Sequence, residues 1–404
     1  MIAVNGRTYR RPGAPTVVVC LDGSAFEYIE RAIAAGVAPY LQSLVRSKFF
    51  RLVCSALPSF TNPNNVSIVT GVPPAAHGIS GNFFLDRATG EAVMMNDASF
   101  LRADTILAAF SNAGVRVAVV TAKDKLRRLL GHGIDPSTGT CVSTEAKGIE
   151  VYSAALSEET LAEGVRLLEA SSAEPPDLMY LSTSDYVQHN YEPGDEAVNR
   201  FYAAIDRSLA SIDASGATLV VTADHGMRAK ADDTGVPRAI YLQEVLDEWL
   251  GAGAARVILP ITDPYVLHHG SLGSCAMVYL AAANDSTAVA QWIGALAGID
   301  LAVPHDRACE EYELPADRTG DIVVFSNGET VIGTRPADHD LSALGAPLRS
   351  HGGRSEQLVP MLANRIINVP AGRRLRNFDA FDLALNGSGY SKTERHRTRD
   401  AGPA

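Results

Sequence analysis

The sequence lacks several features that would place the chain in a specialised class of protein. It contains only five cysteines in 404 residues and no CxxC pair, so a disulfide framework is not indicated. No apolar run approaches the roughly 20 residues that span a bilayer, and the first residues do not have a signal-peptide pattern. We therefore expect reduced thiols, a cytoplasmic location and no membrane partner.

Positive charge is also scarce. The 35 Lys and Arg residues against 46 Asp and Glu residues give a formal net charge of −11, which argues against a nucleic-acid partner. This balance still permits a local basic pocket for a small anion, and it leaves homodimerisation open. Hydrophobic residues make up 46% of the chain, so a packed core of two to three domains, or one large domain with an insertion, is feasible.

Short apolar runs alternate with helical periods along much of the chain. Such runs predict buried strands at residues 16–22, 66–71, 116–122, 177–183 and 218–224. Helices are expected at residues 25–36, 38–46, 102–114, 157–171 and 194–213. Continuous apolar strands separated by helices indicate a parallel sheet that is covered on both faces. The predicted fold class is therefore α/β, with a doubly wound, mostly parallel sheet.

A different pattern occupies residues 238–347. Closely spaced short runs predict a β-rich α+β unit with one helix at 286–298 and other runs at 255–260, 275–283, 308–315, 321–327 and 330–335. We expect this unit to be a smaller cap, inserted into a metal-binding catalytic core formed by residues 13–237 and 348–385. Residues 386–404 lack apolar periodicity and are expected to form a polar C-terminal tail.

Aspartate and histidine gather at the ends of the apolar runs. The residues concerned are Asp22, Asp185, His189, Asp224, His225 and His351. Ligands of open α/β sheets bind outside the carboxyl ends of the strands, so Asp22, Asp185 and Asp224 are expected to converge at one edge. Asp185 and His189 are four residues apart, and on a helical turn they would face the same way.

Three carboxylates and three imidazoles are too many ligands for one tetrahedral ion and suit two ions. Mixed oxygen and nitrogen ligands favour Zn²⁺, with Mn²⁺ or Fe as competitors, because Mg²⁺ and Ca²⁺ prefer more oxygen. A lone aspartate at a strand end is commonly a turn or a cap, and only the whole set outweighs that interpretation. We predict two zinc ions per chain.

Thr61 lies in a polar, turn-rich segment just before a predicted helix or strand, where free backbone N–H groups favour an anion. A hydroxyl is a poor nucleophile near neutral pH, but metal coordination lowers its pKa. By itself, a threonine before Asn-Pro would be interpreted as a cap or turn. Beside a two-metal site we predict that Thr61 is the catalytic nucleophile.

The order of these residues, from 16 to 355, resembles the alkaline phosphatase superfamily and is most similar to its nucleotide pyrophosphatase/phosphodiesterase-like branch. The resemblance implies two ligand sets: Asp185, His189 and His351 for one ion, and Asp22, Asp224, His225 and Thr61 for the other. It also implies a threonine nucleophile. Sulfatases need a C/S-x-P-x-R segment, which the sequence around Thr61 lacks, and phosphoglycerate mutases use serine.

Three segments, FTNPNN, GISGNFFLD and TAKDKLRRLLG, are similar to the phosphonoacetate hydrolase family. The resemblance implies that Asn82 holds a phosphoryl oxygen and that Lys123 and Lys125 bind the carboxylate of the substrate. Thr61, His189 and His351 are also expected to contact the substrate. An isolated K-x-K at a strand end is usually a solvated surface, and this remains the alternative for the lysine pair.

The predicted function is hydrolysis of the C–P bond of a small organophosphonate, phosphonoacetate, to acetate and phosphate through a phosphothreonine. The alternative is a metal-dependent phosphodiesterase, nucleotide pyrophosphatase or phosphatase acting on a small phosphate ester. A non-catalytic binding protein is disfavoured because the ligands and the nucleophile are intact. Arg127 and Arg128 are expected to face solvent, and no role is assigned to His132, His268 or His269.

Overall fold

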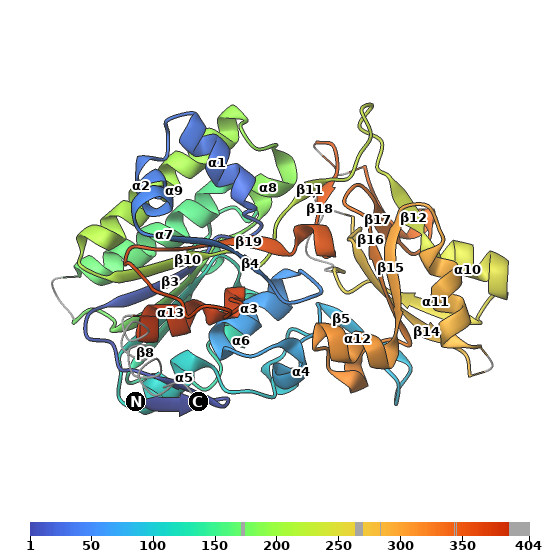
Figure 1. Cartoon of the computed structure of the whole chain (residues 1–404), viewed down its shortest axis with the longest axis horizontal. Helices are drawn as coiled ribbons and strands as arrows, with labels where there is room; N and C mark the ends of the chain where they lie inside the picture. Colours follow the sequence, from blue (N-terminus) through green and yellow to red (C-terminus); the bar gives the residue numbers. More distant parts are fainter. Residues whose placement is uncertain (171–173, 263–269, 283, 343, 345, 388–404) are drawn as a thin grey trace, which may run out of the picture.

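The computed structural model contains two main β-sheets, each with its own hydrophobic core (Figure 1). It describes residues 1–170, 174–262, 270–282, 284–342, 344 and 346–387. His268, His269 and residues 388–404 of the expected tail lie outside the described residues.

The larger sheet has seven strands in the order β4-β19-β10-β3-β9-β7-β8. Their bounds are β3 Thr16–Cys20, β4 Phe49–Cys54, β7 Val117–Thr121, β8 Gly139–Ser143, β9 Leu178–Ser182, β10 Thr218–Thr222 and β19 Leu358–Ala363. The strands from β10 to β8 are parallel to one another, and only β19 is antiparallel to its neighbours β10 and β4. This arrangement confirms the predicted α/β class and its mostly parallel sheet.

Helices cover both faces of the larger sheet. Successive side chains of a strand point to opposite faces, so Val17 and Val19 join one core while Val18 and Cys20 join the other. The first core packs against α1 Phe26–Ala34, α2 Pro39–Ser47, α7 Ala154–Glu169 and α9 Glu196–Ala214. The second packs against α3 Thr61–Thr70, α5 Ile106–Asn112, α6 Asp124–Leu130 and α13 Ala380–Asn386.

The segment 66–71, which the sequence pattern predicted to be a strand, belongs to helix α3, so this prediction was wrong. Periodicity cannot separate a buried strand from a helix that is buried on all sides, and every residue from Asn62 to Thr70 is buried. A helix signal was present at its end, where Gly71 takes a left-handed conformation (φ 70°) and closes the helix.

The smaller sheet has four antiparallel strands in the order β13-β14-β16-β15. Its elements are α10 Leu242–Leu250, β13 Ala255–Ile258, β14 Cys275–Leu280, α11 Ser286–Gly294, β15 Ile299–Pro304, α12 His305–Tyr312 and β16 Ile322–Ser326. The run 308–315 was expected to be a strand, but it lies in α12 and the turn after it. Ala308 and Tyr312, four residues apart, both pack on the sheet, which is a helical spacing.

Shorter elements link and extend these two parts. Their bounds are β1 Ile2–Val4, β2 Arg7–Tyr9, α4 Pro74–His77, β5 Phe83–Asp86, β6 Glu91–Met94, α8 Tyr186–Asn190, β11 Arg228–Ala229, β12 Ala239–Tyr241, β17 Val331–Gly333 and β18 Arg349–Ser350. The chain leaves the larger sheet through β11 and returns through β18, and these two strands pair with each other between the sheets (Figure 1). The division of the chain into a core and a cap at 238–347 stays a prediction.

Two further observations concern the cysteines and the length of the apolar helices. All five cysteines are free. Within the described part of the chain, no helix has the length and apolar character needed to cross a membrane.

Candidate active site

Three aspartates lie at the carboxyl ends of three neighbouring parallel strands. Asp22 follows β3, Asp185 follows β9 and Asp224 follows β10, and β3 lies between the other two strands. All three side chains are buried, with residue exposures of 1%, 4% and 0%. The structure thus brings the three carboxylates together at one edge of the sheet, as their positions after parallel strands predicted.

Thr61 is the first residue of α3, and its Oγ1 atom lies 3.2 Å from Nε2 of His225. One helical turn later, Asn65 donates from Nδ2 to the backbone oxygen of Thr61 (3.0 Å) and to Oδ2 of Asp224 (3.0 Å). The Oδ1 atom of Asn65 accepts from the hydroxyls of Tyr180 (2.7 Å) and Ser182 (2.8 Å). All four hydrogen-bonding positions of this amide are filled, so Asn65 fixes the start of α3 against the sheet edge.

Asn65 is a residue that the sequence analysis missed. The available signal was its spacing of four residues from Thr61, which places both on one side of a helix. Because residues 66–71 were assigned to a strand, that spacing had no structural meaning. The error in secondary structure therefore also concealed a site residue.

The three histidines share one hydrogen-bonding pattern. Each donates from Nδ1 to a backbone carbonyl: His189 to Arg349 (2.8 Å), His225 to Gly226 (2.8 Å) and His351 to Ser59 (3.0 Å). A carbonyl oxygen can only accept, so the proton of each neutral ring is on Nδ1 and Nε2 presents a lone pair.

These Nε2 lone pairs face carboxylate oxygens. The Nε2 atoms of His189 and His351 lie 3.0 and 3.7 Å from Oδ2 of Asp185. The Nε2 atom of His225 lies 3.2 Å from Oδ1 of Asp22. Lone pairs and carboxylates that converge in this way form a donor set for cations, so the residues present fit divalent metal ions.

The six side chains (Asp22, Asp185, His189, Asp224, His225 and His351) are called the ligand cluster below. Two triplets in it place their ligand atoms within 4.8 Å of one another: Asp22, Asp224 and His225, and Asp185, His225 and His351. The first triplet contains three of the four residues of one predicted set, and the fourth, Thr61, has its Oγ1 atom 3.2 Å from Nε2 of His225. The second joins His225, whose ring stacks on that of His351 at 3.6 Å, to Asp185 and His351 of the other predicted set. The third member of that set, His189, has its Nε2 atom 3.0 Å from Oδ2 of Asp185.

The charges in the ligand cluster repel one another in the absence of a cation. Burial, followed by the charges of Asp185 and Asp224, raises the pKa of Asp22 well above its usual value. Burial likewise raises the pKa of Asp224 to about 6. Burial, then the neighbouring His225 and His189, lower the pKa of His351 well below its usual value. Bound cations would relieve the repulsion between these carboxylates.

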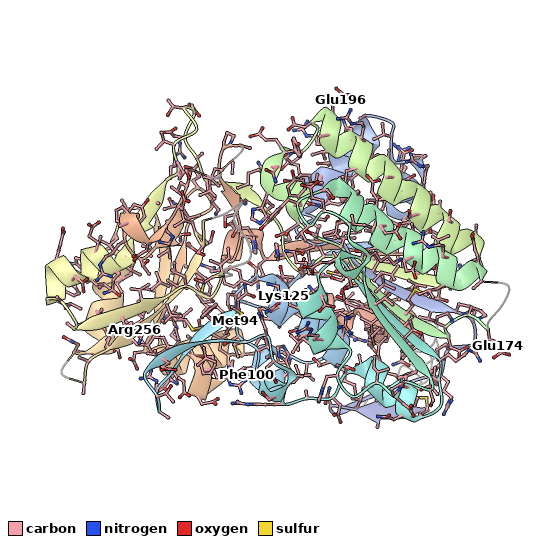
Figure 2. The ribbon with its side chains drawn as sticks, turned by 180° about the vertical axis from the view of Figure 1, so that it is seen from behind. Met94, Phe100, Lys125, Glu174, Glu196 and Arg256 are labelled. Atoms are coloured by element: carbon pink, nitrogen blue, oxygen red, sulfur yellow. The ribbon has the colours of Figure 1, made fainter. Side chains whose placement is uncertain are left out.

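The predicted lysine pair lines a cavity of about 430 Å³ at the end of β7, the strand next to β9. This lysine pocket is lined by Met94, Asn96, Lys123, Asp124, Lys125, Arg128, Glu145, Val151 and Tyr152. The Nζ atom of Lys123 lies 3.7 Å from Oδ1 of Asp185, so the pocket adjoins the ligand cluster. In Figure 2, Lys125 and Met94 lie near the middle of the view, whereas the labelled Glu174 and Glu196 lie at its edges.

The two lysines differ electrostatically. Burial, with the adjacent charge of Lys123 as the second cause, lowers the pKa of Lys125 to about 7. Burial also acts to lower the pKa of Lys123, but the charges of Asp185 and Asp22 outweigh it and the pKa is raised. Lys123 therefore stays charged near neutral pH, whereas Lys125 titrates there.

The remaining predicted residues have simpler surroundings. Asn82 donates from Nδ2 to the backbone oxygen of Ile261 (3.1 Å), and its role toward a phosphoryl oxygen stays a prediction. Arg127 and Arg128 both pair with Asp124, at 2.7 and 2.9 Å. His132 is exposed.

Known proteins resemble this chain in sequence and in fold. A family model described as type I phosphodiesterase / nucleotide pyrophosphatase matches residues 16–354. Crystal structures of phosphonoacetate hydrolase from Sinorhizobium meliloti 1021, in complex with phosphonoformate and with phosphonoacetate, are 51% and 50% identical to the chain. Each of the two matches covers 96% of this chain and 98% of the hydrolase chain, and each has a TM-score of 0.91.

More distant relatives share less. One solved structure is that of murine ectonucleotide pyrophosphatase / phosphodiesterase 5, an inactive variant in complex with AMP. It is 18% identical to this chain, and the match covers 92% of this chain and 93% of the murine chain with a TM-score of 0.66. This similarity shows the common fold alone. An uncharacterised pyrophosphatase/phosphodiesterase of Schizosaccharomyces pombe is 40% identical over 76 residues, which are 19% of this chain but only 15% of that protein. The chain therefore belongs to the type I phosphodiesterase / nucleotide pyrophosphatase family of alkaline phosphatase-like proteins, in the branch that includes phosphonoacetate hydrolase.

Proposed function

We propose that this protein hydrolyses the carbon–phosphorus bond of phosphonoacetate to give acetate and phosphate. The observation that carries the proposal is the position of Lys123 and Lys125 in a pocket that adjoins the ligand cluster. A substrate with a phosphonate at one end and a carboxylate at the other needs cations at both ends. The ligand cluster could hold metal cations for the phosphonate, and the lysine pair provides positive charge for the carboxylate. The 51% identity to phosphonoacetate hydrolase supports the same substrate.

We assign two Zn²⁺ ions to the ligand cluster, with Mn²⁺ or Fe as competing metals. The proposed sets are Asp185, His189 and His351 for one ion, and Asp22, Asp224, His225 and Thr61 for the other. When bound, such ions neutralise phosphonate oxygens and lower the pKa of a coordinated hydroxyl. The protonated Nδ1 atoms hold all three imidazoles in the tautomer that this role requires.

In the proposed reaction the hydroxyl of Thr61 releases its proton to solvent, its Oγ1 atom attacks phosphorus in line, and the C–P bond breaks with its electron pair left on carbon. The products of this step are a phosphothreonine and the carbanion of acetate, whose charge spreads onto its carboxylate oxygens as an enediolate. Lys123 and Lys125 stabilise that charge, and a proton from solvent completes acetate. A water molecule then attacks the phosphothreonine and releases phosphate and Thr61. Asn82, His189 and His351 are proposed to contact the phosphonate.

The second candidate is a metal-dependent phosphodiesterase, nucleotide pyrophosphatase or phosphatase for a small phosphate ester, which the description of the matching family favours. Such a substrate has no carboxylate for the lysine pair to bind. The two candidates therefore differ at the lysine pocket and share the ligand cluster. A cytoplasmic location, homodimerisation and the absence of nucleic-acid and membrane partners stay predictions from the sequence.

The experiment that tests the proposal measures phosphate release from phosphonoacetate by the purified full chain, with metal analysis of the same sample. A diester, bis-(p-nitrophenyl) phosphate, and a monoester, p-nitrophenyl phosphate, are assayed in parallel. We expect phosphonoacetate to have the highest kcat/KM and the active sample to contain two metal equivalents. Preference for the diester with no turnover of phosphonoacetate would establish the second candidate, and a fully active sample with one equivalent would exclude the two-metal site.

A further inference from the structure

A fully buried ion pair lies outside the ligand cluster and takes no part in the proposed reaction. The Nζ atom of Lys230 lies 3.0 Å from Oε1 of Glu356, and both side chains have an exposure of 0%. Two separated charges in such a place would be strongly unfavourable, and removing one partner leaves the other buried without compensation. A pair of this kind needs an explanation beyond general stability, because an apolar pair of similar volume is often as stable.

Each partner of the pair also binds a different part of the molecule. Lys230 donates from Nζ to the backbone oxygens of Gly328 (3.0 Å) and Asn327 (3.4 Å), which follow strand β16 of the smaller sheet. The Oε2 atom of Glu356 accepts from the backbone N–H of Gly353 (3.0 Å). The pair therefore joins the smaller sheet to the segment after β18.

That segment carries His351, and Glu356 also reaches the other histidine loop. The backbone oxygen of Glu356 accepts from the N–H of Gly226 (2.7 Å), the residue next to His225. Gly352 has a φ of 116°, and a Cβ atom there would lie 2.2 Å from the ring of Phe60, so the backbone beside His351 has little room to shift. One residue thus contacts the backbone beside two candidate metal ligands.

We infer that the Lys230–Glu356 pair is a positioning device that sets the backbone beside His225 and His351 for metal binding and couples it to the smaller sheet. The inference rests on the proposed two-metal site. Lys230 neutralises the carboxylate of Glu356 and holds it in place, and the carboxylate then orients the Gly353 N–H two residues after His351. Partners of metal ligands commonly change metal affinity by about 10- to 100-fold when they are removed.

The test compares zinc affinity with folding stability in the full chain. Zinc affinity of the metal-free protein is measured by competition with a chromophoric chelator, and stability of the metal-free protein by urea unfolding. We expect Lys230→Met to weaken binding of at least one of the two ions by about 10- to 100-fold and to destabilise the fold. Lys147→Met, which breaks an exposed lysine pair with Glu159 and Glu163, is the control and should leave zinc affinity unchanged.

The double variant Lys230→Met/Glu356→Leu separates positioning from stability. It leaves no unpaired charge at the buried position of this pair, so stability should return toward that of the wild type. Zinc affinity should stay low, because the Gly353 N–H has lost its acceptor. Recovery of zinc affinity together with stability would overturn the inference, as would wild-type affinity in Lys230→Met. If the wild-type chain binds fewer than two zinc ions, the two-metal site fails, and the inference falls with it.

Discussion

The ligand cluster and the lysine pocket lie at the ends of adjacent strands, but the protein holds them in different ways. In the ligand cluster, backbone carbonyls hold the three imidazoles, and Asn65 holds both Asp224 and the start of α3. The lysine pocket is lined instead by residues of β6, α6 and the loops after β6, β7 and β8. We propose that the two regions have different roles. The ligand cluster would carry out the reaction at phosphorus, and the lysine pocket would select the substrate.

The largest expected effect comes from removing the nucleophile in the ligand cluster. Thr61→Ala should lower kcat by more than about 10³-fold for phosphonoacetate and for p-nitrophenyl phosphate alike, because both need the same attacking oxygen. Thr61→Ser should keep measurable activity. The assays are steady-state kinetics, and metal analysis of Thr61→Ala serves as the control for an intact site. Activity near that of the wild type in Thr61→Ala would mean that a water molecule attacks phosphorus directly.

The next largest effect, that of replacing a pocket lysine, should differ between the two substrates. Lys123→Ala or Lys125→Ala removes a contact to a charged group, which typically contributes about 1.5–3 kcal/mol and corresponds to a roughly 10- to 150-fold loss of kcat/KM for phosphonoacetate. The loss for p-nitrophenyl phosphate, which has no carboxylate, should be much smaller. Arg127→Ala, in the same helix but paired with Asp124, is the matched control. Equal losses on both substrates would show that the lysines do not recognise the carboxylate.

A smaller effect on both substrates is expected from Asn65. In Asn65→Ala the hydroxyls of Tyr180 and Ser182 and one oxygen of Asp224 lose their partner, and each such loss costs about 1–3 kcal/mol. We expect reduced stability in urea and about a tenfold loss of kcat on both substrates. Asn199→Ala, at a surface helix, should change neither. A loss confined to phosphonoacetate would contradict the proposed division between cluster and pocket.

These two regions also show what a sequence can and cannot predict. Asp22, Asp185 and Asp224 were predictable because each directly follows a continuous apolar strand, and parallel strands end at a common edge. Helix α3 was not, because it is buried on all sides and its short apolar run at residues 66–69 has the pattern of a buried strand.

Contacts between distant residues leave no local pattern at all. Lys230 and Glu356 are 126 residues apart, and neither has a sequence context that indicates a buried charge. The surroundings of Lys123 and Lys125 depend in the same way on where the loops after β6 and β8 pack. The sequence could therefore indicate which lysines matter but not the cavity that they line.

The smallest expected effect concerns pH and acts only in the lysine pocket. The pKa of Lys125 is lowered to about 7, so its side chain is charged below that pH and neutral above it. Its contribution to binding the carboxylate is therefore present at low pH and is lost as the pH rises through 7, whereas Lys123, whose pKa is raised, stays charged. The ratio of kcat/KM for phosphonoacetate to that for p-nitrophenyl phosphate should fall by at most about fivefold between pH 7 and 8.

Taking this ratio cancels any titration in the ligand cluster, because both substrates use it. Arginine stays protonated across this range, so Lys125→Arg should make the ratio independent of pH. A ratio that falls equally in the wild type and in Lys125→Arg would assign the titration to another group and would remove Lys125 from carboxylate recognition.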